Sequence, residues 1–172
     1  HYVDGPVFLN HELDKIEKVV DQGIDKFYLS YVYDWDHVHQ FRELIGDESQ
    51  LILKIENKLG LQWVRDHYKP VKNTNLAAAR GDLYVEVDYP HEIMKAVKLI
   101  IEKDPGAFVG SRMLLSMVNS SIPSCADLSE LAWLSDIGYK NFLLCDELCL
   151  QEKLLARSIN VFDAFREEYV CG

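Results

Sequence analysis

The sequence predicts an α/β fold built around a parallel sheet. Apolar residues switch repeatedly between helical spacing and short buried runs, and this alternation favours interleaved helices and strands over segregated layers. A unit of one helix and one strand repeats about five times within 172 residues. When a helix connects two successive strands, the second strand joins the sheet parallel to the first. The pattern therefore fits a doubly wound sheet or a barrel equally well.

The first two units extend to residue 55. Residues 11–23 carry apolar side chains at helical spacing and end in glycine, which predicts a helix, and residues 26–32 then have the composition of a strand. A second helix over residues 35–45 is closed by Gly46 and leads into an apolar strand over residues 51–55.

The middle of the chain contains one weak element. Residues 61–73 hold a short helix at most, and it should end before Pro70 because the residue that precedes a proline disfavours helical geometry. Strands over residues 75–79 and 107–110 flank a strongly amphipathic helix over residues 91–103.

The last elements complete a count of five strands. We expect a helix over residues 126–135, a strand over residues 141–144 and one or two helices over residues 148–169. A barrel of eight such units usually takes about 250 residues. On the barrel interpretation, about three strands are therefore absent from this chain.

Composition and charge exclude several classes of function. A formal charge of −10 argues against a nucleic-acid or membrane surface, because both attract clustered lysine and arginine. No apolar run approaches the ~20 residues that cross a bilayer, and no cleavable signal is visible at the start. The four cysteines lack zinc-ribbon spacing, so we expect a reducing, cytoplasmic location. Because the first residue is His1, we expect a processed or excised piece.

Lys54, Glu56 and Asp82 are the strongest candidates for a functional site. Each lies where an apolar strand should stop, and residues two apart on a strand, such as Lys54 and Glu56, point to the same face. In Arg80-Gly81-Asp82, the glycine lets the backbone approach a ligand and the neighbouring amides can donate to an anion. Mg²⁺ takes one or two protein carboxylates plus substrate oxygens, and a nearby lysine would neutralise a phosphoryl group or an enolate.

Each candidate also has a purely structural explanation. A lysine and a glutamate two apart on a strand often form a rim ion pair that contributes little stability. An aspartate that follows a glycine is often a turn residue.

The motifs KIEN, ARGDL and RMLLSM occur in this order, and together they resemble the second half of the pyruvate kinase catalytic barrel. The resemblance implies that Lys54 contacts a phosphoryl group and that Glu56 and Asp82 hold Mg²⁺ or Mn²⁺. It also implies that the substrate carboxylate is bound by the backbone of Ala79, Arg80 and Gly81.

The resemblance assigns two serines and one arginine as well. Ser111 stands where the family has threonine, so we expect its hydroxyl near the substrate carbon, with a catalytic and a substrate-binding role. The family's next residue, glutamine, is Arg112 here, which adds a charge that could change the anion bound. Ser30 corresponds to a serine that lines the family's pocket, and an exposed strand hydroxyl explains it equally well.

The resemblance also selects the fold. It implies a TIM (β/α)8 barrel of the phosphoenolpyruvate- and pyruvate-binding type, with residues 1–172 forming a single, incomplete domain of about the last five units. The first three strands, the lid and most of the nucleotide site would lie in a missing half, in the same chain or another, together with any monovalent-cation site. A homo-oligomer is expected, and the family's carboxyl-terminal regulatory domain, which would follow Gly172, is expected to be absent from this chain.

Three departures from the family's motifs point to a diverged paralogue rather than a housekeeping enzyme of glycolysis. The motif PTRAE becomes PSCAD at residues 123–127, which removes an arginine that supports the subunit contact. The motif SGET becomes CDEL at residues 145–148, where only the glutamate is kept. Tyr84 puts a bulky ring after Gly81-Asp82-Leu83, where the family has glycine.

The predicted reaction is Mg²⁺-dependent phosphoryl transfer between phosphoenolpyruvate and ADP, which gives pyruvate and ATP. We expect this segment alone to be inactive and to bind ADP weakly, because the nucleotide half is not in it. A metal-dependent aldolase or lyase that acts on another small keto acid through a pyruvate enolate is an alternative. A non-catalytic module that keeps the fold for assembly is a third.

Overall fold

A computed structural model of the chain describes residues 8–170. Helices and strands alternate along it, as the periodicity predicts. In chain order the elements are α1 (Asn10–Asp21), β1 (Lys26–Leu29), α2 (Trp35–Ile45), β2 (Gln50–Ile55), α3 (Lys58–Asp66), β3 (Thr74–Ala79), α4 (Arg80–Glu86), α5 (Glu92–Lys103), β4 (Phe108–Gly110), the 3₁₀ helix η1 (Leu115–Val118), α6 (Cys125–Asp136), β5 (Asn141–Phe142), α7 (Asp146–Cys149), α8 (Glu152–Phe165) and the π-helical turn η2 (Arg166–Val170).

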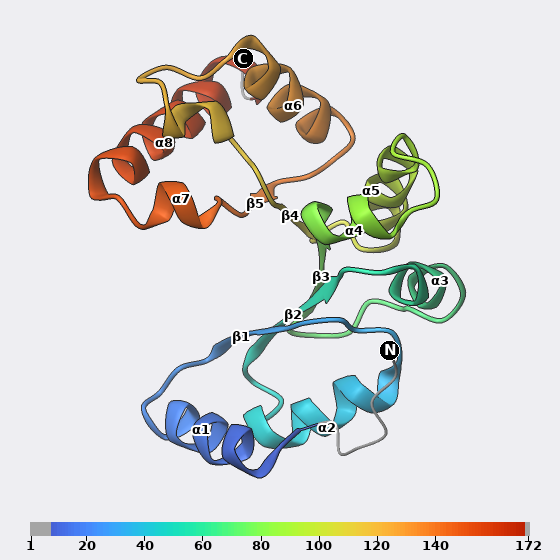
Figure 1. The fold of residues 1–172 in the computed structure, drawn as a ribbon. Helices are drawn as coiled ribbons and strands as arrows, with labels where there is room; N and C mark the ends of the chain where they lie inside the picture. Colours follow the sequence, from blue (N-terminus) through green and yellow to red (C-terminus); the bar gives the residue numbers. More distant parts are fainter. Residues whose placement is uncertain (1–7, 171–172) are drawn as a thin grey trace.

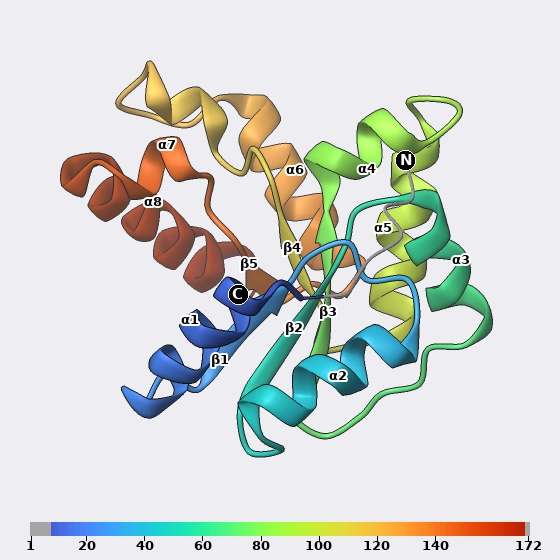
Figure 2. The same ribbon diagram turned by 60° about the horizontal axis from the view of Figure 1, so that its bottom comes forward.

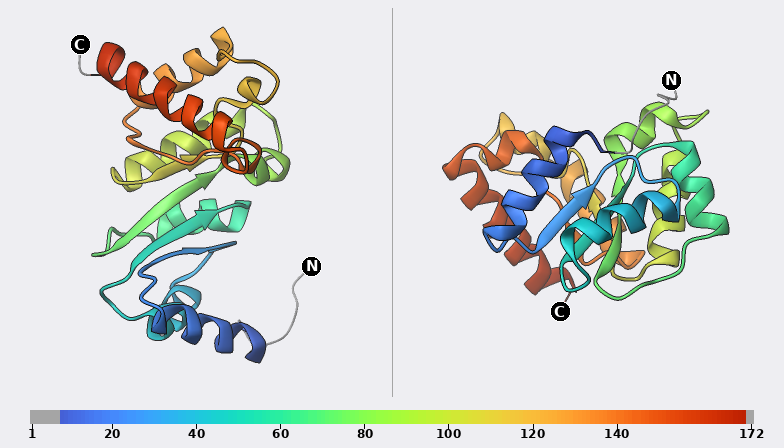
Figure 3. Two further views of the ribbon diagram at one scale, coloured as in Figure 1. Left: turned by 90° about the vertical axis from the view of Figure 1, so that its left-hand side faces the viewer. Right: turned by 90° about the horizontal axis from the view of Figure 1, so that it is seen from below.

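The five strands form one parallel sheet in the order β1-β2-β3-β4-β5. Strands that are neighbours in sequence are therefore neighbours in the sheet, without the reversal of order that divides a doubly wound sheet. Right-handed crossovers then place the connecting helices on one side. In Figure 1 the helices form an incomplete ring around the strands, and the left panel of Figure 3 looks through its open side onto the strands. The arrangement is that of part of a barrel.

Alternation along the strands separates the two faces of the sheet. Leu53 and Ile55 of β2 are fully buried in the core between the sheet and the helices. Lys54 and Glu56 alternate with them and face the other side, toward the barrel interior. This inner face continues across the sheet, because Lys54 is paired with Ala77 of β3.

The helix layer is built from amphipathic helices. Helix α5 buries Ala96, Val97, Ile100 and Ile101 and presents lysines on its opposite side. It packs against both α3 and β3, and Figure 2 shows α3 and α5 side by side. No helix within residues 8–170 is long and apolar enough to cross a lipid bilayer.

At the amino end of the strands, Asp104 ties the turn before β4 to β3. Its buried carboxylate accepts hydrogen bonds from the backbone amides of Leu76 (2.7 Å) and Gly106 (2.9 Å) and from the side-chain amide of Asn75. Arg42 makes a similar connection between α2 and β3 by donating to three backbone carbonyls and one hydroxyl. These contacts hold together the end of the sheet that is opposite to the predicted site.

Several predicted bounds were wrong. Strand β1 ends at Leu29 rather than at residue 32, because Tyr31 has a φ of 54°, which lies outside the strand region. The weak helix expected after residue 60 begins at Lys58, since the Asn57 side chain caps it by accepting a hydrogen bond from the Gly60 amide at 2.8 Å. The region over residues 148–169 divides into α7, α8 and the turn η2.

Helix α4 was not among the expected elements. It follows β3 without an intervening loop, and its N-cap residue, Ala79, has no side chain that could signal a helix start. The helix matters for function because it carries Arg80, Gly81 and Asp82.

Candidate functional site

The predicted site residues lie at the carboxyl end of the sheet. Ser30 directly follows β1, Glu56 follows β2 and Ser111 follows β4. Asp82 lies in the first turn of α4, which begins where β3 ends. Because the strands are parallel, these positions share one rim, which is the rim where barrel enzymes hold their substrates.

Lys54, Glu56 and Ser30 form a connected cluster at this rim. The Lys54 ammonium lies 2.6 Å from Oε1 of Glu56 and 3.3 Å from the Ser30 hydroxyl oxygen. The second Glu56 oxygen accepts a hydrogen bond of 2.6 Å from the backbone amide of Tyr31. Glu56 is 2% exposed, whereas the Lys54 side chain is 31% exposed. A buried carboxylate thus fixes a lysine whose end reaches a cavity.

A strained turn follows β4. Ser111 and Arg112 have φ values of 72° and 61°, and Leu114 has 52°. This left-handed region is unfavourable for residues other than glycine and is often retained at functional sites. The turn therefore needs support from neighbouring side chains.

Arg80 supplies that support. Its Nε donates to the carbonyl of Gly110 at 2.9 Å, and Nη2 donates to the carbonyl of Ser111 at 2.6 Å. Its Nη1 pairs with Glu130 of α6 at 2.6 Å. All three guanidinium nitrogens are thus engaged by the protein, and the side chain is 13% exposed. Through these contacts, Arg80 holds the Ser111-Arg112 turn in place.

A cavity of about 400 Å³ opens beside this turn. It brings together three predicted residues, Lys54, Ala79 and Ser111, with Arg112. Residues that were not predicted as site residues close it on the β5 side: Leu143, Leu144, Cys145, Asp146 and Glu147. They follow the last strand just as the predicted residues follow the earlier ones, and that position was the signal that could have identified them.

The surroundings of Glu147 favour its charged form. A hydrogen bond from its own backbone amide, a hydrogen bond from the Cys145 thiol and the nearby charge of Arg112 together lower the pKa of Glu147 below its usual value. Arg112 and Glu147 therefore face the same cavity with opposite charges.

Gly81 and Asp82 are placed differently from the cavity residues. A Cβ atom on Gly81 would lie 3.4 Å from the Ser111 side chain, so this part of α4 packs closely on the turn. A second hollow of about 470 Å³ lies between α4, α5 and α6. It is lined by Arg80, Gly81, Ser111 and Tyr84, and also by Arg112, which therefore borders both hollows. Asp82 is exposed and lines neither hollow, and Glu56 lies behind Lys54.

Glu56 and Asp82 are the carboxylates that the sequence predicts as ligands of a hard divalent cation shared with a substrate. Residues 8–170 contain no cluster of three or more His, Cys, Asp or Glu side chains that could hold a metal by itself. Glu56 and Asp82 provide two carboxylates, and Mg²⁺ is usually bound by one or two carboxylates plus waters and substrate oxygens. Each Glu56 oxygen already accepts one contact and retains a second lone pair.

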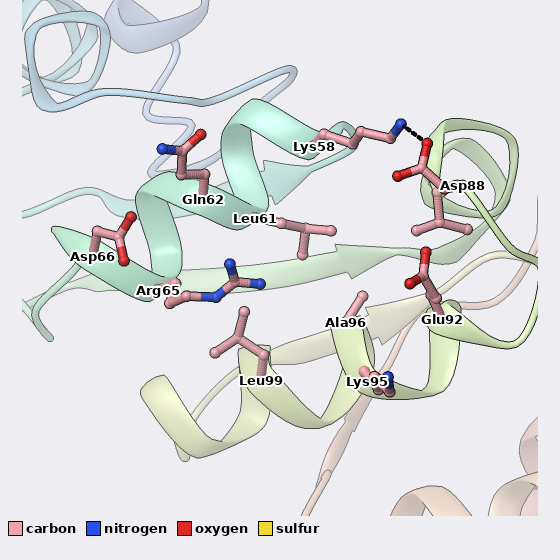
Figure 4. A pocket seen from close by; sticks show the side chains of 11 residues that line it. Lys58, Leu61, Gln62, Arg65, Asp66, Asp88, Glu92, Lys95, Ala96 and Leu99 are labelled. Atoms are coloured by element: carbon pink, nitrogen blue, oxygen red, sulfur yellow. Dashed lines mark hydrogen bonds and ion pairs between the residues drawn. The ribbon is translucent and has the colours of Figure 1, made fainter.

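A larger hollow of about 570 Å³ lies elsewhere, in the outer groove between α3 and α5 (Figure 4). The Lys58–Asp88 ion pair closes one end of it, and Leu61 and Leu99 line its floor. It contains none of the predicted residues, and its three basic side chains are balanced by three acidic ones. The predicted site residues therefore lie at the strand ends and not in this groove.

Comparisons with known proteins identify the family. A family model described as the barrel domain of pyruvate kinase matches residues 2–136. The pyruvate kinase of Thermoplasma acidophilum is 34% identical over 123 residues, which cover 67% of this chain and 22% of that protein. The enzyme of Dictyostelium discoideum is 30% identical over 139 residues, or 76% and 26% of the two chains. That of Methanocaldococcus jannaschii is 24% identical over 179 residues, or 97% and 40%.

The chain spans between 22% and 40% of the length of these three relatives. The family match and the sequential order of the parallel strands confirm the predicted barrel fold. The resemblance carried by the three motifs is also confirmed: the chain belongs to the pyruvate kinase family, as part of its catalytic barrel.

Proposed function

We propose that this chain forms the enolate-binding part of a pyruvate kinase-like phosphotransferase. The reaction is Mg²⁺-dependent transfer of a phosphoryl group between phosphoenolpyruvate and ADP. The observation that carries the proposal is the Lys54 ammonium, held at 2.6 Å by the buried Glu56 carboxylate on the wall of a cavity. A fixed cation in such a place suits a phosphoryl group or an enolate.

Each of these residues has a separate role in the proposed reaction. As the phosphorus–oxygen bond of phosphoenolpyruvate breaks and an ADP oxygen takes the phosphoryl group, the electron pair stays on the enolate oxygen, and Lys54 offsets the transferred charge. Protonation at the adjacent carbon, near Ser111, then gives pyruvate. Ser30 orients the Lys54 ammonium through its 3.3 Å contact.

Glu56 and Asp82 would hold the metal, which supplies Lewis-acid neutralisation of enolate and phosphoryl oxygens when it is bound. The backbone of Ala79, Arg80 and Gly81 would take the substrate carboxylate. The Arg80 side chain has another task, because it supports the Ser111 carbonyl.

The edges of the sheet suggest further parts of the site. In the described chain, β1 and β5 are each paired on one side only. A strand edge offers unpaired backbone groups, and closing a barrel satisfies them. We propose that further β/α units complete the barrel and supply the nucleotide site.

Oxalate, a planar dianion that imitates the enolate of pyruvate, tests the proposal. In calorimetric titrations with saturating Mn²⁺, we expect the wild-type chain to bind oxalate and Asp82→Asn to bind it about tenfold more weakly or not at all, because a charged metal ligand is lost. Asp14→Asn, on the exposed face of α1, is the matched control and should bind like the wild type. Equal binding by Asp82→Asn would remove Asp82 from the metal site.

A further inference from the structure

The cavity at the strand ends has a cation on either side of an apolar floor. Lys54 comes from β2, and Arg112 comes from the turn after β4. The other lining residues that are not acidic are small or apolar, apart from Ser111: Ala77, Ala78, Ala79, Gly110, Leu143, Leu144 and Cys145. Two anionic groups joined by a short hydrocarbon link match this pattern.

The backbone that carries Arg112 is organised before any ligand arrives. Ser111 and Arg112 both occupy the left-handed region, and the Arg80 guanidinium holds the two carbonyls that precede Arg112. Glu130 in turn fixes Arg80 at 2.6 Å. Strained backbone that its surroundings hold in place is concentrated at functional sites and ligand contacts.

The two cations differ in what they already bind. Lys54 is paired with the buried Glu56 carboxylate. Arg112, by contrast, has no ion pair within 4.0 Å in the described part of the chain. Its charge does reach Glu147, since it contributes to the lowered pKa of that carboxylate. The Arg112 guanidinium therefore keeps its planar fork of donors for an incoming carboxylate or phosphate.

We propose that Arg112 is a specificity-determining residue that selects acids carrying a second anionic group. On this assignment, the 2-oxo or enol acid end of the ligand lies at Lys54 and the metal, and the far anion lies at Arg112. The site thus also accepts a 2-oxo dicarboxylic acid or a comparable phosphorylated acid, whose second anionic group Arg112 binds. The inference rests on the proposed enolate site and adds the class of substrate that the site accepts.

Two ligands of equal length distinguish a specific contact with Arg112 from a general attraction of anions to the cavity. Both 2-oxoglutarate and 2-oxovalerate contain five carbons, and they differ in a terminal carboxylate against a terminal methyl group. In calorimetry with saturating Mn²⁺, we expect the wild type to bind 2-oxoglutarate about tenfold more tightly than 2-oxovalerate, as a charge-assisted contact at a partly exposed site allows. Arg112→Gln should reduce this preference to about twofold or less and leave oxalate binding within about twofold of the wild type.

Three further variants complete the design. Arg112→Lys keeps the charge without the planar fork and should keep part of the preference. Glu147→Gln removes a competing carboxylate and should strengthen 2-oxoglutarate binding without affecting 2-oxovalerate. Arg157→Gln, at an exposed position of α8, is the control for loss of a distant positive charge and should match the wild type.

The outcomes also separate this inference from the proposed function. If oxalate binds and Arg112→Gln keeps the full preference for 2-oxoglutarate, the role of Arg112 is overturned while the enolate site stands. An equal loss of affinity for all three ligands in Arg112→Gln would likewise overturn it, because that pattern indicates damage to the turn. If folded wild type binds neither oxalate nor 2-oxoglutarate, both proposals fail.

Discussion

Replacing Lys54 with methionine should abolish metal-dependent oxalate binding and lower the free energy of unfolding by about 2 kcal/mol. The stability effect arises because Glu56, which is 2% exposed, would lose the ammonium at 2.6 Å and remain as a buried, unpaired carboxylate. Partial exposure of Lys54 keeps the effect below that of a fully buried pair. Urea unfolding and calorimetry measure the two quantities on the same sample.

The double variant Lys54→Met with Glu56→Gln separates stability from function. Glutamine can still accept the hydrogen bond from the Tyr31 amide and carries no charge that needs a partner. We therefore expect stability to return to within about 1 kcal/mol of the wild type, while oxalate binding stays lost. Recovery of binding in the double variant would contradict the roles given to Lys54 and Glu56.

Removing the Asp104 carboxylate should have the largest effect on folding. Asp104→Ala leaves the buried amide of Leu76 and the amide of Gly106 without their acceptor, and each unsatisfied buried group costs about 1–3 kcal/mol. We expect the free energy of unfolding to fall by about 3 kcal/mol, as measured by chemical denaturation.

Asp88→Ala is the control for Asp104. Asp88 is an exposed carboxylate that forms an ion pair with Lys58 on the outer surface, and such exposed pairs contribute little to stability. A change of similar size in both variants would mean that the hydrogen bonds at the amino end of β3 do not account for the effect.

The sequence predicted those elements that carry local end signals. The bounds of α2 match the prediction at both ends, because the Asp34 side chain caps its start and Gly46, with a φ of 78°, closes it. Helix α4 has no such signal at Ala79 and was missed. The strand order followed from neither periodicity nor capping, because contacts between strands are not local. It became predictable only through the resemblance to the family.

The candidate site residues were chosen from the sequence because they lie where apolar strands end. The spacing of two residues on a strand placed Lys54 and Glu56 on one face, and their side chains lie 2.6 Å apart. The support of the Ser111-Arg112 turn by Arg80 and Glu130 was not predictable, because it joins residues 50 positions apart in sequence. Residues 143–147 were not predicted as site residues, because their motif differs from that of the family.

The changed motif PSCAD has a structural role that can be recognised from the sequence. In PSCAD, Asp127 accepts hydrogen bonds from the Ser116 and Ser124 hydroxyl groups and completes a capping box at the start of α6. Serine followed three residues later by an acidic residue is the signature of such a cap. This carboxylate therefore serves the fold at that position.

The most direct test of the account is the position of the metal. Crystals soaked with Mn²⁺ and oxalate and measured at the manganese absorption edge would reveal the ion as an anomalous difference peak. We predict that the peak lies between the Glu56 and Asp82 carboxylates, with oxalate on the side of Lys54. A peak held by Asp146 and Glu147 instead, or bound oxalate without a metal at Glu56 and Asp82, would contradict the proposed site.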